Sequence, residues 1–100
     1  MVDMTYKNDI LTADLYGEID HHIAPRVRCE IDAKCESLRP KVLRLDFKAV
    51  TFMDSSGVGL VMGRQRCISL LGGRLEVVHI PKQIEKVFSL SGLGSLGVLK

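Results

Sequence analysis

The sequence is short of the features that usually accompany binding to nucleic acid. It has no tryptophan, two tyrosines and three phenylalanines, and it contains no basic run. With 14 basic and 12 acidic side chains, the formal net charge is only +2. Nucleic-acid-binding domains usually show a strongly basic surface. The composition therefore argues against nucleic acid as the main partner and favours a protein or a small ligand.

Long apolar segments are also missing. No stretch approaches the roughly 18 to 20 apolar residues that a membrane-spanning helix needs. The first six residues, MVDMTY, lack the basic start and the apolar core of a signal peptide. We therefore predict a cytoplasmic protein with no membrane partner.

Cysteines are too few for a disulfide framework. Cys29, Cys35 and Cys67 are odd in number and form no CxxC motif. We interpret them as reduced, mostly buried thiols. A hydrophobic content of 46% over 100 residues is sufficient for one core. The chain is predicted to form a single domain over residues 1–100, which neither a metal nor a disulfide has to stabilise.

Two alternating segments at the start predict a hairpin. Residues 2–7 and 11–16 both alternate apolar and polar side chains, and Asn8 and Asp9 between them tolerate the positive φ of a tight turn. Gly17 is predicted to end the second strand, and residues 17–22 are predicted to form a polar connection.

A first helix should follow, since Pro25 suits an initial helical turn and Arg39-Pro40 ends the pattern. Its apolar face comprises Ile23, Val27, Ile31, Cys35 and Leu38. The apolar run at 42–47 lies between two helical patterns, which is typical of a central strand covered by helices.

The next helix is predicted to run from the turn Asp54-Ser55-Ser56-Gly57 to the glycine pair at 72–73. Its apolar stripe comprises Val58, Val61, Met62, Gln65 and Ile68, widened by Leu60, Leu70 and Leu71. Gly57, Gly59 and Gly63 are expected to let this helix lie close to the sheet.

The remaining sequence predicts a strand with Leu75, Val77, Val78 and Ile80, and then a helix. This last helix has Ile84, Val87 and Phe88 on its inner face and ends near Gly92. A final short strand is predicted at 96–99. The resulting order predicts an α/β domain with a mixed four- or five-stranded sheet, in which an N-terminal hairpin is joined to parallel strands by helical crossovers.

The serine pair at the start of the second helix is the strongest functional signal. Asp54 or Ser55 can serve as the N-cap, because a short side-chain oxygen there accepts from an unpaired amide. Capping does not explain a second hydroxyl, nor why Gly57 leaves it uncrowded. A kinase needs such access, and a helix start tolerates a phosphate. We therefore expect Ser56 to be open to phosphorylation without loss of the fold.

Enzymatic alternatives fit the same turn poorly. The spacing Gly57-x-Gly59-x-x-x-Gly63 has one residue too many for a dinucleotide fingerprint. Neither serine has the preceding glycine of a hydrolase nucleophile elbow, and sequence alone ties no histidine to either of them.

A metal site is not expected either. His21 and His22 are adjacent in a loop, so their rings should point in different directions, and no second ligand pair follows. We predict no enzymatic activity, no cofactor and no metal.

Four segments, residues 17–22, 52–59, 72–75 and 88–93, closely resemble the bacterial anti-sigma factor antagonists, which are STAS-domain proteins. The sporulation type is the nearest match, to which the Asp-His-His loop also points. This resemblance implies a STAS fold of four or five strands with helices on one side of the sheet.

The resemblance also implies a switch between partners. The unphosphorylated protein would bind an anti-sigma factor that is itself a serine kinase, and this would release a sigma factor for transcription. The kinase would use ATP to phosphorylate Ser56, and a PPM-type serine phosphatase would reverse the reaction. The implied partner-binding residues are Asp20, Asp54, Ser55, Ser56, Gly57 and Gly59.

Two alternatives stay open on the sequence. One is a STAS module of a stress-signalling scaffold or an accessory subunit of a transporter, which would keep the fold and change the partner. The other is a nucleotide-binding or hydrolytic protein.

Overall fold

The structure is a computed structural model that describes residues 1–91, with side chains described as far as Phe88. Strands and helices follow the order β1 (Val2–Lys7), β2 (Ile10–Ile19), α1 (Ala24–Leu38), β3 (Val42–Met53), α2 (Ser55–Leu70), β4 (Arg74–Val78) and α3 (Lys82–Ser91). The strand predicted at 96–99 lies outside the described residues.

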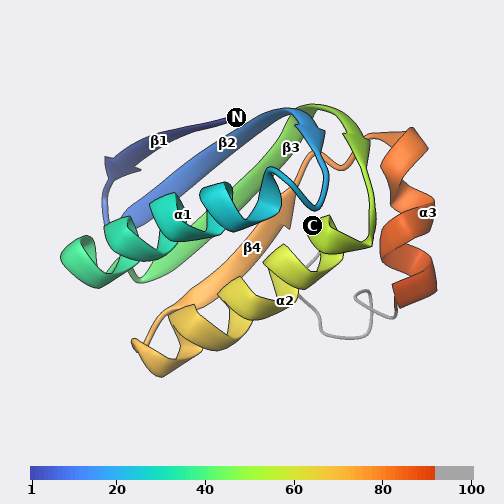
Figure 1. Cartoon of the computed structure of the whole chain (residues 1–100). Helices are drawn as coiled ribbons and strands as arrows, with labels where there is room; N and C mark the ends of the chain where they lie inside the picture. The colour runs from blue at the N-terminus through green and yellow to red at the C-terminus, as the bar shows by residue number, and fades with distance from the viewer. Residues whose placement is uncertain (92–100) are drawn as a thin grey trace.

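One mixed sheet in the order β1-β2-β3-β4 forms the centre of the fold. β1 pairs antiparallel with β2, whereas the β2–β3 and β3–β4 pairs are parallel. Helices α1 and α2 lie side by side across one face of the sheet, and α3 stands at its end (Figure 1). Phe88 of α3 packs edge-on against Phe47 of β3, with ring centroids 5.4 Å apart. The predicted arrangement of a hairpin, parallel strands and helices on one side is confirmed.

The hairpin turn has the expected backbone, but β2 is longer than predicted. Asn8 and Asp9 have φ values of 54° and 65°, which match the predicted tight turn. Gly17 does not end the strand: its φ is +78°, and the register of β2 against β3 shifts between Gly17 and Glu18. This irregularity, typical of a bulge, lets β2 continue to Ile19. The side chain of Ile19 is fully buried, so the polar connection begins only at Asp20.

The central strand β3 is twice as long as the predicted run at 42–47. Its second half has exposed residues at Lys48, Ala49, Thr51 and Phe52, which interrupt the apolar pattern. The added length carries the chain directly to Asp54. In contrast, β4 ends before Ile80, because His79 has a left-handed backbone with φ of 56°.

The two main helices pack on the covered face of the sheet. The predicted inner face of α1 is confirmed: Val27, Ile31 and Cys35 are buried, and Ile23 and Leu38 pack against the core. The stripe on α2 was partly wrong, since Met62 and Leu70 are 44% and 82% exposed. The buried residues of α2 are Gly57, Val58, Leu60, Val61, Arg64 and Ile68.

Burial of the cysteines is only partly as predicted. All three thiols are free, Cys35 is buried, Cys67 is half-buried and Cys29 is exposed. Cys29 lies on the outer face of α1, so the prediction of a mostly buried set was wrong for this residue. Burial raises the pKa of Cys35 to about 11, so this thiol stays protonated at neutral pH.

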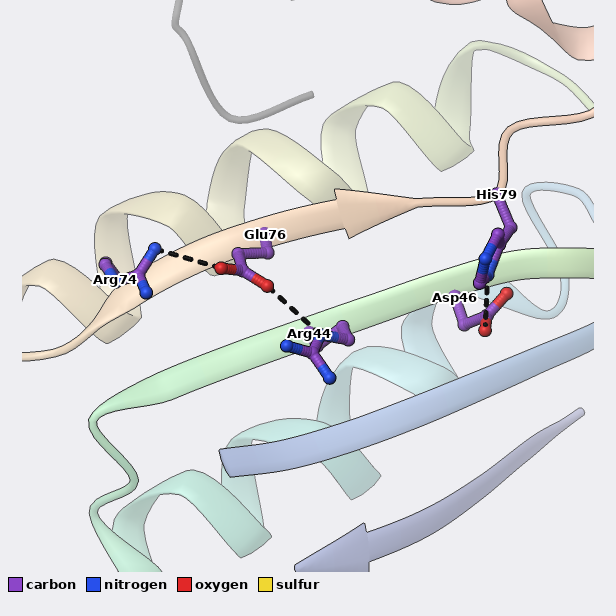
Figure 2. A network of polar contacts seen from close by, with 5 residues as sticks. All are labelled: Arg44, Asp46, Arg74, Glu76 and His79. Carbon is purple, nitrogen blue, oxygen red and sulfur yellow. Dashed lines mark hydrogen bonds and ion pairs between the residues drawn. The ribbon is translucent and has the colours of Figure 1, made fainter. Parts of the chain in front are cut away.

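The opposite face of the sheet is polar and carries a network of ion pairs (Figure 2). Glu76 of β4 accepts from Arg44 Nε and from Arg74 Nη1, both at 3.0 Å. Asp46 Oδ2 lies 2.9 Å from His79 Nδ1. Burial works to raise the pKa of Glu76, but the hydrogen bonds and charges of Arg44 and Arg74 together outweigh it and hold the pKa below its usual value. These acidic side chains are therefore matched by partners from this chain.

Candidate functional site

The site begins where β3 passes into α2. Asp54 is the N-cap, with an extended backbone, and its Oδ1 accepts from the Ser56 N–H at 2.8 Å. The bond from the Ser56 amide is the main cause of a lowered pKa at Asp54. This settles the choice of cap, and it leaves Ser55 exposed and Ser56 half-buried at the helix start.

The three glycines of α2 have different surroundings. Gly57 is buried, and a Cβ there would collide with the Met53 side chain, so Gly57 permits close packing at the strand–helix junction. At Gly59 and Gly63 a Cβ would meet nothing within 4 Å. The expectation of close packing on the sheet was therefore right for Gly57 and wrong for the other two, which keep the outer surface of the helix bare.

The loop before α1 lies against this junction. Asp20 Oδ1 accepts from the N–H groups of His22 and Ile23, at 2.9 and 3.1 Å, and so shapes the turn that leads into the helix. The Asp54 N–H donates to the carbonyl oxygen of Ile19 at 3.4 Å, which joins the two segments. The structure thus brings Asp20 and the serine turn to the same end of the sheet.

His21 also links the two segments. Its Nδ1 lies 3.7 Å from Asp54 Oδ2, with 70% of the histidine side chain exposed. The rings of His21 and His22 lie together, with centroids 4.1 Å apart and planes inclined by 38°. The expectation that the two rings point in different directions was therefore wrong. Among residues 1–91, no three His, Cys, Asp or Glu side chains form a group that could hold a metal.

A cleft of about 270 Å³ opens between the start of α1 and the first turns of α2. Its lining residues are His21, Ala24, Pro25, Arg28, Ser56, Gly59, Leu60, Gly63 and Arg64. Ser56 therefore lies on the wall of an open cleft and is not enclosed in the core. Of the residues predicted for the site, only Ser56 and Gly59 line this cleft. Asp54 caps the helix that carries Ser56, and Asp20 shapes the loop that carries His21.

Sequence reasoning missed the basic side of this cleft. Arg28 comes from α1, one helical turn after Pro25, and Arg64 comes from α2, two turns after Ser56. The available signal was the helical spacing of Ser56, Gly59, Gly63 and Arg64, which places small residues and an arginine along one stripe. Of this stripe, only Gly59 and Gly63 were predicted to pack against the sheet.

Arg64 is the buried charge of the site, with 4% of the residue exposed. Its Nε lies 2.8 Å from Asp32 Oδ1, the distance of an ion pair, although the angle is not that of a hydrogen bond. Its Nη2 donates to Cys67 Sγ at 3.7 Å. Its Nη1 is buried without a hydrogen-bond partner in the part of the chain that the structure describes.

Comparison with known proteins agrees with this geometry. Residues 1–97 match the STAS domain, and the chain belongs to the STAS family. It is 32% identical to the anti-sigma F factor antagonist of Paenibacillus polymyxa, over 92% of this chain and 79% of that protein.

Two solved structures resemble the whole chain at 31% identity. SpoIIAA, an anti-sigma factor antagonist, in its unphosphorylated form gives a TM-score of 0.87 and is covered to 86% of its length. The phosphorylated form of SpoIIAA from Bacillus gives a TM-score of 0.78 and is covered to 89%. Both matches extend over 100% of this chain. No helix within residues 1–91 is long and apolar enough to cross a membrane.

Proposed function

We propose that this chain is a cytoplasmic anti-sigma factor antagonist of the sporulation type. In its unphosphorylated form it binds an anti-sigma factor serine kinase and thereby frees a sigma factor for transcription. The observation that best supports this proposal is the position of Ser56, on the first turn of α2 and on the wall of an open cleft. The relation to an anti-sigma F factor antagonist supports the same conclusion.

The proposed docking surface is the end of the sheet where α2 begins. Ser55 is exposed there, and Gly59 adds no side chain, so a partner's backbone can approach the helix closely. Asp54 and Gly57 hold the serine turn in shape, and Asp20 presents the neighbouring loop to the kinase. The protein itself performs no catalysis in this scheme.

Ser56 is the acceptor of the phosphoryl group. The kinase transfers the γ-phosphoryl group of ATP to Ser56 Oγ, so a new O–P bond forms while the bond to ADP breaks. The hydroxyl proton passes to a base of the kinase. A PPM-type phosphatase then hydrolyses the ester and returns serine and inorganic phosphate. That SpoIIAA exists in both forms with this fold supports a modification that leaves the fold intact.

Charge is sufficient to turn the complex off. Phosphorylation adds nearly two negative charges and takes the formal net charge from +2 to about 0. A carboxylate about 6 Å from the phosphate is repelled by roughly 3 kcal/mol per unit charge at an effective dielectric near 20. Salt reduces this value. A total of ~3 kcal/mol still lowers affinity on the order of a hundredfold.

The test uses three variants and the kinase captured from the native lysate. Ser56→Ala should bind the kinase as the parent does, whereas Ser56→Asp should fail to bind. Ser69→Asp is the matched control, because it adds the same charge to α2 at an exposed position near the other end of the helix, and it should bind as the parent does. Equal binding of Ser56→Asp and the parent would show that charge at this position does not control the complex.

Mass spectrometry tests the residue assignment. After incubation with the kinase and ATP, phosphate should be found on Ser56 alone, and phosphate on Ser55 would overturn the assignment. The protein incubated with labelled ATP without a kinase should show no turnover. Intrinsic turnover would instead favour the nucleotide-binding or hydrolytic alternative.

A further inference from the structure

The charged side chains that line the cleft beside Ser56 are basic, whereas an acidic side chain lies at its open rim. Arg28 and Arg64 line it from α1 and α2, and His21 lines it from the preceding loop. The acidic groups nearby are Asp54, which faces His21 at the rim, and Asp32, which lies beside Arg64. Asp32 balances the charge of Arg64, and the described residues that line the cleft include no acidic partner for Arg28.

Arg64 adds a hydrogen-bond donor that the protein does not use. A buried N–H without a partner costs free energy, and such groups are usually satisfied by a ligand or water when they occur. The Nη1 of Arg64 is such a group, in a residue that lines the same cleft as Ser56. The other two nitrogens of its guanidinium face Asp32 and Cys67, which fixes the plane of the group.

A phosphoryl group on Ser56 would be repelled by the carboxylate of Asp54, which lies close enough to accept from the Ser56 N–H at 2.8 Å. The remaining direction along the wall leads into the cleft, whose volume of about 270 Å³ far exceeds the ~10–15 Å³ that one water needs. Arginine guanidinium groups bind phosphate oxygens strongly, often through two hydrogen bonds.

We propose that phospho-Ser56 folds into this cleft, where Arg28 binds its phosphoryl group beside the buried guanidinium of Arg64. This inference rests on the proposed function, since it requires phosphate at Ser56. The phosphorylated protein then differs from the unphosphorylated one in two ways: it carries a repulsive charge, and the cleft between α1 and α2 is filled. The partner loses that cleft as a docking feature.

The test installs phosphoserine at position 56 during translation, so that no kinase is needed, and follows its ³¹P resonance through a pH titration. The second pKa of a phosphoserine is ordinarily about 6. In the protein with no other change, the second pKa of phospho-Ser56 should be lower by about one unit, which corresponds to a tenfold lower affinity for the proton. In the Arg28→Gln variant, this pKa should move most of the way back to its ordinary value.

Arg26→Gln is the matched control. It removes the same charge from an exposed position on α1 that does not line the cleft, so the pKa of the phosphate should stay lowered. Equal pKa values in the two variants, or an ordinary value near 6 in the parent, would show that the phosphate points to solvent. Arg64 is left unchanged because it is buried and paired.

A second arm adds inorganic phosphate to the unphosphorylated protein. Its ³¹P resonance should respond equally to the parent and to Arg28→Gln. A selective response to the parent would make the cleft a site for free phosphate and overturn the assignment to phospho-Ser56. Because the kinase takes no part, a phosphate that points to solvent leaves the proposed function intact, and failure of kinase binding leaves this result intact.

Discussion

The glycines near the two ends of α2 serve opposite purposes. At the far end, a Cβ on Gly73 would lie 2.7 Å from the carbonyl oxygen of Pro40 and 2.9 Å from the Ile68 side chain. Within α2, beyond the packed Gly57, both Gly59 and Gly63 face open space along the cleft. Packing therefore requires a glycine at position 73. At positions 59 and 63, glycine weakens the helix, which alanine would stabilise.

This difference separates the part of α2 that holds the fold from the part that is kept bare for a ligand or partner. A glycine in a helix interior is destabilising unless something needs the space. Nothing within the described residues needs it at Gly59 or Gly63. We therefore infer that what needs the space approaches from outside the chain, or arrives with modification of Ser56.

Gly73→Ala should disrupt the packing at the end of α2 and give the largest change in the free energy of unfolding. The added methyl group meets backbone oxygens of Pro40 and Lys41, which cannot move easily, as well as Ile68. Overpacking of this kind typically costs about 1–3 kcal/mol of folding free energy. Urea unfolding should show this loss, and a change below about 0.5 kcal/mol would show that the glycine is not needed for packing.

Gly63→Ala and Gly59→Ala should have the opposite sign. Each should raise the free energy of unfolding by about 0.5–1 kcal/mol, because alanine loses less backbone entropy and meets no neighbour. Affinity for the kinase should fall at the same time, because a methyl group enters the docking surface. A destabilised Gly59→Ala protein, or one stabilised with unchanged affinity, would contradict the distinction between the two ends.

Glu76→Gln should give the smallest change and leave kinase binding unaltered. Glu76 is on the polar face of the sheet (Figure 2) and does not line the cleft. The pKa of Glu76 is lowered in the folded protein. Its contribution is therefore present above the unfolded pKa, near 4.3, and is lost as pH falls through the folded value. The contribution is at most about 1 kcal/mol for such a pair.

Urea unfolding at pH 7 and at acid pH measures this effect. The parent should lose more stability on acidification than Glu76→Gln, and Glu30→Gln, a change at an exposed glutamate of α1, should behave as the parent does. Identical acid sensitivity of Glu76→Gln and the parent would show that the ion pairs with Arg44 and Arg74 do not stabilise the fold.

Local patterns were sufficient to predict the order of elements and the sheet. The Asn8-Asp9 turn, the first-turn Pro25 and the cap at Asp54 each act through a few neighbouring residues, which sequence displays directly. The length of β2 could not be predicted, because it depends on a register shift against β3 at Gly17. That shift is a property of two paired strands and not of either one alone.

The site was predicted only in part for the same reason. Ser56 and its two candidate caps, Asp54 and Ser55, lie in one short segment that the sequence displays directly, and the structure selects Asp54 as the cap. Arg28 is far from Ser56 in the sequence, and only the side-by-side packing of α1 and α2 brings the two residues to the same cleft (Figure 1). A buried Arg64 was unexpected because charged residues are seldom buried, and it depends on its contact with Asp32.

The most direct test of the whole account is the affinity of the captured kinase for two forms of this protein, measured by calorimetry. One form carries the natural Ser56, and the other carries phosphoserine installed at that position during translation. We expect the dissociation constant of the phosphorylated form to be about a hundredfold larger or more. Equal dissociation constants would contradict the claim that the charge on one hydroxyl of α2 decides whether the complex forms.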